Sequence, residues 1–240
     1  MTERVQFRRP ADGYPESIRL ADAVSAGDRD GVVAALAAIP AAGDRGCVQR
    51  LVAASCRRID VETRDIGSPE GRSVAVLAAH GLVVQAWTAR GTGSSDETSP
   101  GQFRRFRDLL VRAERILVNV VAADPGHADA WDLRIVTARG LGLGLGEIRR
   151  RHQRLVELAP THLPAHQDML VALCPRWFGT WPEAFEHARE VSAAAAPGSL
   201  GAALILIAHL EGWVEKGPDY LAQDAVVDEV VEAGRAAGFH

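Results

Sequence analysis

The chain has 240 residues and a formal net charge of −4, and 47% of its residues are apolar whereas only 5% are aromatic. This acidic balance argues against a nucleic-acid-binding module, which is usually basic. The apolar run that comes closest to a membrane span, residues 200–210, is shorter than the roughly 20 residues that cross a bilayer. The odd number and the spacing of Cys47, Cys56 and Cys174 predict reduced thiols in a cytoplasm, without a disulfide framework or a zinc ribbon.

The first predicted elements form a short helical hairpin. Residues 16–25 and 30–39 have helical patterns on either side of Gly27-Asp28, and Asp28 is a suitable N-cap for the second helix. A third helix is expected over residues 45–58.

A longer helix is expected to follow, because Ser68-Pro69-Glu70 combines an N-cap, a first-turn proline and an early acid. It should run to about Arg90, where residues 91–101, rich in Gly, Ser and Thr, predict a loop. The next helix has one apolar stripe with its arginines mostly on other faces. The stripe consists of Phe103, Phe106, Leu110, Ala113, Leu117 and Val120.

In the rest of the chain, prolines recur at a nearly regular spacing. Pro125, Pro160 and Pro197 are 35 and 37 residues apart, and each is followed five residues later by an alanine. This spacing is typical of stacked helix-turn-helix repeats. The predicted pairs are 127–140 with 147–158, 162–174 with 182–196, and 200–215 with 220–237, and the last helix should be acidic outside and valine-rich inside.

The segment from Asp124-Pro125 to Ala130-Trp131 resembles the junction between tetratricopeptide repeats. The chain is also similar to an uncharacterised family of bacterial tetratricopeptide-like proteins through Trp87–Gly91, Thr137–Gly142, Cys174–Thr180 and Ala208-His209. The resemblance implies an all-α, right-handed α-solenoid of stacked antiparallel helix pairs over residues 67–240. Residues 1–66 would form a helical segment packed on it.

The expected function is that of a non-catalytic interaction module in the cytoplasm, which binds a protein or peptide on its concave face. The candidate binding residues are Trp131, Arg134, Arg139, His166, Arg176, Trp177 and His209. The alternative is a small-molecule binding protein or enzyme with an enclosed pocket lined by tryptophan, histidine and arginine. A homodimer through the stripe of residues 103–120 is a third interpretation. No catalytic residue, cofactor or nucleic-acid partner is predicted.

Two motifs have a competing chemical interpretation. His162 and His166 share a helix face as metal ligands must, but His127 and His162 both follow a junction proline by two residues, which favours an N-cap, and Ser199 has the same place in the third repeat. We therefore predict no metal site. The glycines of residues 140–146 lack the spacing of a phosphate loop and predict a turn.

A third motif concentrates aromatic residues in the segment 175–182, where Thr180 and Glu183 have the spacing of a capping box. The aromatic side chains of this segment are expected to fill the apolar space between two repeats. Its alternative role is the aromatic wall of a groove, with Arg176 available to a carboxylate. The arginine-rich run of residues 147–154 is expected to be a solvated helix face.

Overall fold

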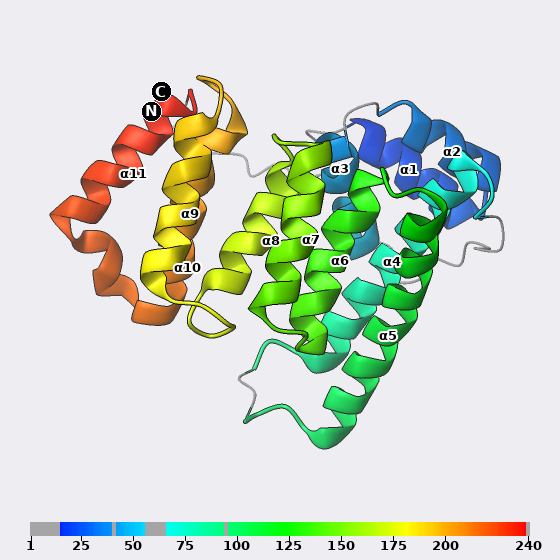
Figure 1. Cartoon of the computed structure of the whole chain (residues 1–240), viewed down its shortest axis with the longest axis horizontal. Coiled ribbons are helices and arrows are strands. Elements are labelled where there is room, and N and C mark those ends of the chain that lie inside the picture. Colours follow the sequence, from blue (N-terminus) through cyan, green and yellow to red (C-terminus); the bar gives the residue numbers. More distant parts are fainter. Residues whose placement is uncertain (1–14, 40–41, 56–65, 94–95, 239–240) are drawn as a thin grey trace, which may run out of the picture. The chain divides into compact units, whose positions relative to one another are not determined.

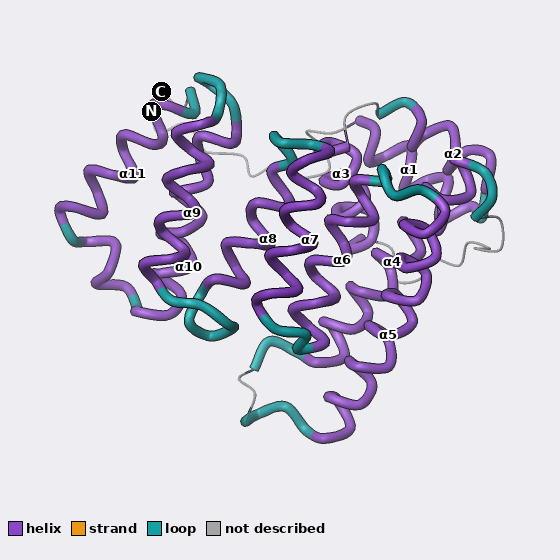
Figure 2. The backbone as a smooth tube through the Cα atoms, in the orientation of Figure 1, coloured by secondary structure: helices purple, strands orange, loops and turns teal. Residues whose placement is uncertain are grey.

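A computed structural model of the chain describes residues 15–39, 42–55, 66–93 and 96–238. Within these ranges the protein is built from eleven α-helices and two 3₁₀ helices, and no strand occurs among them (Figures 1 and 2). The all-α class is therefore confirmed. None of the helices in the described ranges has both the length and the apolar character needed to cross a membrane.

The chain divides into two compact units, Met1–Thr137 and Ala138–His240, and the division falls inside α6 (Ala128–Leu141). The division expected from the sequence, between residues 66 and 67, lies within the first of these units and stays a prediction. We describe each unit by itself.

The first unit begins with α1 (Pro15–Ala26), α2 (Arg29–Ala37) and α3 (Ala42–Ser55). The predicted hairpin is confirmed: Gly27 has a φ of 67°, and the side chain of Asp28 accepts a hydrogen bond from the amide of Gly31. Residues 56–58 of the predicted third helix lie outside the described residues. These helices contribute buried apolar side chains such as Leu20 and Leu36 to one core with α4.

The longest elements are α4 (Pro69–Arg90) and α5 (Pro100–Ala123), which pack along each other (Figure 1). The expected cap is present, because Ser68 accepts a hydrogen bond from Gly71. The loop is shorter than expected, since Ser99 and Gln102 form a reciprocal capping box that starts α5 earlier.

The apolar stripe of α5 is buried from Phe106 to Val120, whereas Phe103 is exposed. The five arginines of its N-terminal two thirds, at positions 104, 105, 107, 112 and 115, are all exposed, as the periodicity predicts. Most of the stripe is thus covered within the first unit and is not an outer face for a second copy.

The second unit contains α7 (Leu145–Leu158), α8 (Leu163–Leu173), α9 (Trp181–Ala194), α10 (Leu204–Lys216) and α11 (Asp224–Ala236). Two 3₁₀ helices, η2 (Leu200–Ala203) and η3 (Pro218–Ala222), precede the last two α-helices. The α-helices therefore start about four residues later than expected. The positive φ of Gly217, 89°, ends α10 and allows Pro218 to open η3.

One expectation for the last helix is wrong in part. Val226 is buried, but Val227 and Val231 are more than 40% exposed. Residues 227 and 231 lie four apart and share a helix face that the second unit leaves uncovered.

Candidate metal centre

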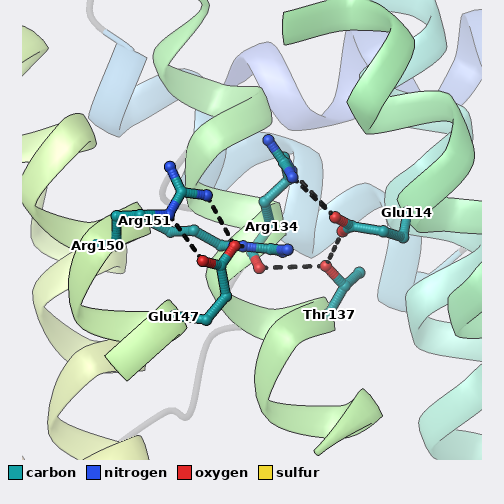
Figure 3. A network of polar contacts seen from close by, with 6 residues as sticks. All are labelled: Glu114, Arg134, Thr137, Glu147, Arg150 and Arg151. Carbon is teal, nitrogen blue, oxygen red and sulfur yellow. Dashed lines mark hydrogen bonds and ion pairs between the residues drawn. The ribbon is translucent and has the colours of Figure 1, made fainter. Parts of the chain in front are cut away.

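Two predicted binding residues, Trp131 and Arg134, lie on α6 in the first unit, and both are buried. The indole Nε1 of Trp131 donates to the carbonyl of Pro125, and the guanidinium of Arg134 lies 4.8 Å from the centroid of the Trp131 ring. Arg134 also donates two hydrogen bonds to Glu114 on α5 (Figure 3). Both side chains thus have partners within their own unit.

Three further predicted residues meet others inside the second unit. Arg139 lies 3.6 Å from the carboxylate of Asp168, and its guanidinium is 5.3 Å from the centroid of the Trp177 ring. Arg176 forms an ion pair with Glu211 on α10. The structure therefore brings Arg139 and Trp177 together, and carboxylates of the same chain neutralise both arginines.

The arginine-rich start of α7 is largely paired as well. Arg150 and Arg151 donate to Glu147, as Figure 3 shows, and Arg149 forms an ion pair with Glu183 on α9 at 2.8 Å. The hydrogen bonds from Arg150, together with those from Arg151, lower the pKa of Glu147 to about 2. The Arg149–Glu183 pair also connects α7 to α9.

His166 has a different environment, because it meets two other histidines. His152 on α7, His166 on α8 and His187 on α9 each offer one ring nitrogen, and these nitrogens all lie within 4.8 Å of one another. The ring centroids are 5.1 to 5.8 Å apart. We call these three residues the histidine trio.

Two backbone carbonyls orient the trio. Nε2 of His166 lies 2.8 Å from the carbonyl oxygen of Pro160, and Nε2 of His187 lies 3.1 Å from that of His166. Since a carbonyl oxygen only accepts, both Nε2 atoms carry the proton and both Nδ1 atoms keep a lone pair. Nε2 of His152 then donates to Nδ1 of His166 across 3.2 Å.

Burial keeps two rings of the trio, those of His166 and His187, uncharged. It lowers the pKa of His166, against the opposing effect of the hydrogen bond to Pro160, and it lowers the pKa of His187 to about 4. Both rings are therefore neutral near pH 7, which is the form that coordinates a metal ion.

The geometry is close to that of a three-histidine metal site. In a tetrahedral zinc site with bonds of about 2.05 Å, ligand nitrogens are about 3.3 Å apart. Nitrogens within 4.8 Å of one another need to approach by at most about 1.5 Å. Backbone carbonyls that hold the second ring nitrogen are the usual outer partners of metal-binding histidines. The trio thus has three ligands, and two of them, His166 and His187, have such supports.

His162 does not belong to this group. Its Nδ1 accepts a hydrogen bond from the amide of Ala165 at 3.2 Å, so it is the N-cap of α8, as predicted. His127 makes the same contact with Ala130 at 3.4 Å. Ser199 occupies the N-cap position of η2, as predicted, but its side chain makes no capping hydrogen bond.

His209, the last predicted binding residue, is buried in a separate network of the second unit. Its Nδ1 lies 2.9 Å from the hydroxyl of Tyr220 and its Nε2 lies 3.0 Å from the carboxylate of Glu229. Arg189 donates two hydrogen bonds to the same carboxylate. This arrangement fixes the ring of His209 inside the unit.

The described thiols have the properties of structural cysteines. Burial raises the pKa of Cys47, and it raises the pKa of Cys174 to about 11. Cys56 lies outside the described residues. Neither described thiol has the low pKa of a nucleophile.

The sequence prediction contained one member of the trio, His166, and missed His152 and His187. A usable signal was present, because each of the three successive helices α7, α8 and α9 contains one of these histidines. Helical periodicity alone does not tell which faces meet. In comparisons with protein-family models, with curated proteins and with solved structures, none matches this chain.

Proposed function

We propose that the second unit binds a divalent transition-metal ion through His152, His166 and His187, with zinc as the first choice. The supporting observation is that three ring nitrogens from three helices lie within 4.8 Å of one another. Two of these rings are already turned by backbone carbonyls so that Nδ1 keeps its lone pair. A metal ion would take the place of the proton between His152 and His166, and neutral His152 would then carry that proton on its other ring nitrogen, Nδ1.

The donor set favours this class of ion. Neutral imidazoles suit zinc, copper, nickel and iron, whereas magnesium and calcium require oxygen ligands. Three histidines leave one position of a tetrahedral ion for water, which zinc can activate near pH 7. A bound metal would support the alternative expectation from the sequence, a small-molecule binder or enzyme, over a purely structural role.

Calorimetric titration of chelator-treated protein with Zn²⁺ tests the proposal. We expect one ion per chain, and we expect Co²⁺ to give the visible absorption of a four-coordinate site. His152→Gln and His187→Gln should each weaken binding by at least about 10- to 100-fold, the range for loss of an outer partner of a metal site. Both residues are only partly buried, so these variants should remain folded.

His127→Gln is the matched control, because His127 is also partly buried but lies in the first unit. It should bind zinc like the unchanged protein. Absence of stoichiometric binding would contradict the proposal, and so would equal weakening in His127→Gln and His152→Gln. Circular dichroism of each variant separates loss of a ligand from loss of the fold.

A second candidate function is the binding of a protein or peptide, as expected from the sequence. The observation that favours it is an exposed apolar face on α10. Leu210, Trp213 and Val214 share this face at helical spacing, and they are 52%, 40% and 65% exposed. This face differs from the predicted set of Trp131, Arg134 and the others, which are engaged within their units.

Sedimentation tests the simplest form of this second candidate, in which the partner is another copy of the chain. Trp213→Glu should shift a concentration-dependent dimer to monomer. Val118→Glu on α5, where the native valine is 42% exposed, is the control and should leave the association unchanged. A monomer at every concentration would contradict the second copy as the partner.

A tetratricopeptide-like, right-handed solenoid for residues 67–240 and a cytoplasmic location are part of the same proposal. What supports the repeat is that the pairs α6/α7, α8/α9 and α10/α11 begin after Pro125, Pro160 and Pro197. An experimental structure that shows the succession of these pairs would test the arrangement.

A further inference from the structure

Lys216, the last residue of α10, points its ammonium group at aromatic rings. Its Nζ lies 4.5 Å from the ring centroid of Tyr220, 4.9 Å from that of Trp181 and 6.0 Å from that of Phe185. Each distance lies within the range of cation–π attraction. In the part of the chain that the structure describes, no ion pair is recorded for this ammonium. We call Trp181, Phe185 and Tyr220 the aromatic cage.

Contacts that do not involve Lys216 hold two walls of the cage. Trp181 and Phe185 are one turn apart on α9 with ring centroids 5.9 Å apart, and Thr180 caps the first turn of this helix by accepting from Glu183. The guanidinium of Arg189 lies 5.4 Å from the centroid of the Phe185 ring. These rings therefore keep their positions when the lysine leaves.

The third wall, Tyr220, is fixed by contacts with Gly212 and His209. Its ring lies against the backbone of Gly212, where an added Cβ would come within 2.9 Å of a ring carbon. Glu229 accepts from Nε2 of His209, so Nδ1 of His209 accepts from the Tyr220 hydroxyl at 2.9 Å. The orientation of this ring thus depends on a glycine and a histidine, and not on the cation in front of it.

Lys216 is the replaceable part of this arrangement. Its side chain is exposed, it ends a helix, and it is followed by Gly217 with a φ of 89°. Its ammonium is on a flexible four-carbon stem and is strongly hydrated. A cation with methyl groups in place of N–H bonds loses less hydration on entering, and its methyl groups can contact all three rings.

We propose that the aromatic cage binds the quaternary ammonium group of a small soluble molecule, and that Lys216 closes the site by occupying the same position. The site is separate from the histidine trio, and neither proposal depends on the other. Lysine and ligand compete, so the apparent affinity of the unchanged protein is reduced by the fraction of time that Lys216 is out of the cage.

Titration with choline, followed by saturation-transfer NMR of its methyl protons, tests the proposal. Lys216→Ala should bind choline about tenfold more tightly than the unchanged protein, because the competing cation is gone. Lys216→Arg is the matched control: it keeps a long cationic side chain and should bind no better than the unchanged protein. Adding Trp181→Leu to Lys216→Ala should abolish binding.

The uncharged isostere 3,3-dimethyl-1-butanol distinguishes a cation site from an apolar crevice. It should bind Lys216→Ala at least about tenfold more weakly than choline, since it lacks the charge that the ring faces attract. Equal binding of the two compounds would overturn the proposal. Failure of folded Lys216→Ala to bind choline would overturn it as well.

Sedimentation with phosphatidylcholine vesicles separates a free ligand from a lipid headgroup, which has the same chemistry. We expect Lys216→Ala to stay in the supernatant while it binds free choline. Pelleting with the vesicles would show that the ligand is a lipid surface and would overturn the assignment to a small soluble molecule.

Discussion

Arg134 donates two hydrogen bonds to one oxygen of Glu114, from Nε at 3.1 Å and from Nη2 at 3.0 Å. The other carboxylate oxygen accepts from the hydroxyl of Thr137, so one acid on α5 holds two side chains of α6 (Figure 3). Both charged side chains are 15% exposed or less.

This relationship predicts that Glu114→Gln destabilises the first unit by about 1–3 kcal/mol, because a mostly buried arginine loses its charged acceptor. Urea denaturation measures the effect. Glu157→Gln is the control, since its pair with Arg154 is exposed and should contribute less than about 1 kcal/mol. Equal losses in the free energy of unfolding for the two variants would show that the Glu114–Arg134 pair contributes no more than an exposed pair.

His80 predicts a dependence of stability on pH. It is buried on α4, and burial, together with the charge of Arg50, lowers its pKa from 6.5 to about 3. Between these values the unfolded chain binds a proton that the folded chain does not. The free energy of unfolding should therefore fall as the pH decreases from 6.5 to 3, by up to about 1.4 kcal/mol per pH unit for this group.

Urea denaturation at several pH values measures this slope in chelator-treated protein. In His80→Gln the free energy of unfolding should change less steeply with pH, by up to about 1.4 kcal/mol per pH unit, which corresponds to one proton. Other histidines with lowered pKa values keep part of the dependence. A slope that does not differ between His80→Gln and the unchanged protein would contradict the assignment.

Gly179 and Gly234 are expected to respond in opposite directions to alanine. A Cβ at Gly179 would lie 2.5 Å from the carbonyl oxygen of Leu173, so Gly179→Ala should cost about 1–3 kcal/mol. A Cβ at Gly234, inside α11, meets nothing within 4 Å, so Gly234→Ala should stabilise by about 0.5–1 kcal/mol. Thermal unfolding of both variants measures the difference and its sign.

A bound metal should stabilise the second unit. At a free zinc concentration of 100 times the dissociation constant, the gain is about 2.7 kcal/mol. Hydrogen exchange should show added protection in α7, α8 and α9, which carry the histidine trio. His187→Gln should remove the added protection. Protection spread evenly over α1 to α5 would indicate that zinc binds elsewhere.

The helices could be predicted closely because their signals are local. Asp28, Ser68 and His162 each accept from an amide three residues ahead, and a residue type with the right spacing is sufficient to predict such a cap. Ser199 is also at an N-cap, but the helix that follows it is a 3₁₀ helix and its side chain makes no capping hydrogen bond.

The candidate site could not be predicted to the same degree, because it depends on which faces of successive helices meet. The repeat pattern points to His166 by its place in the second repeat, whereas its neighbours in the structure, His152 and His187, are 14 and 21 residues away in the sequence. From the sequence, Arg139 and Trp177 are candidate binding residues, but their contact with each other cannot be predicted from it. Such pairings depend on packing between helices, which periodicity does not determine.

Lys216 is the only lysine of the 240 residues, and it lies exposed at the end of α10 next to Gly217. A lysine-specific protease therefore has one cleavage position in the whole chain. Cutting there would divide the protein between α10 and η3 and would separate Tyr220 from Trp181 and Phe185 along the chain. Because the protease must bind the lysine side chain, the cut requires Lys216 to leave its aromatic neighbours, and a ligand that displaces Lys216 should make the cut faster.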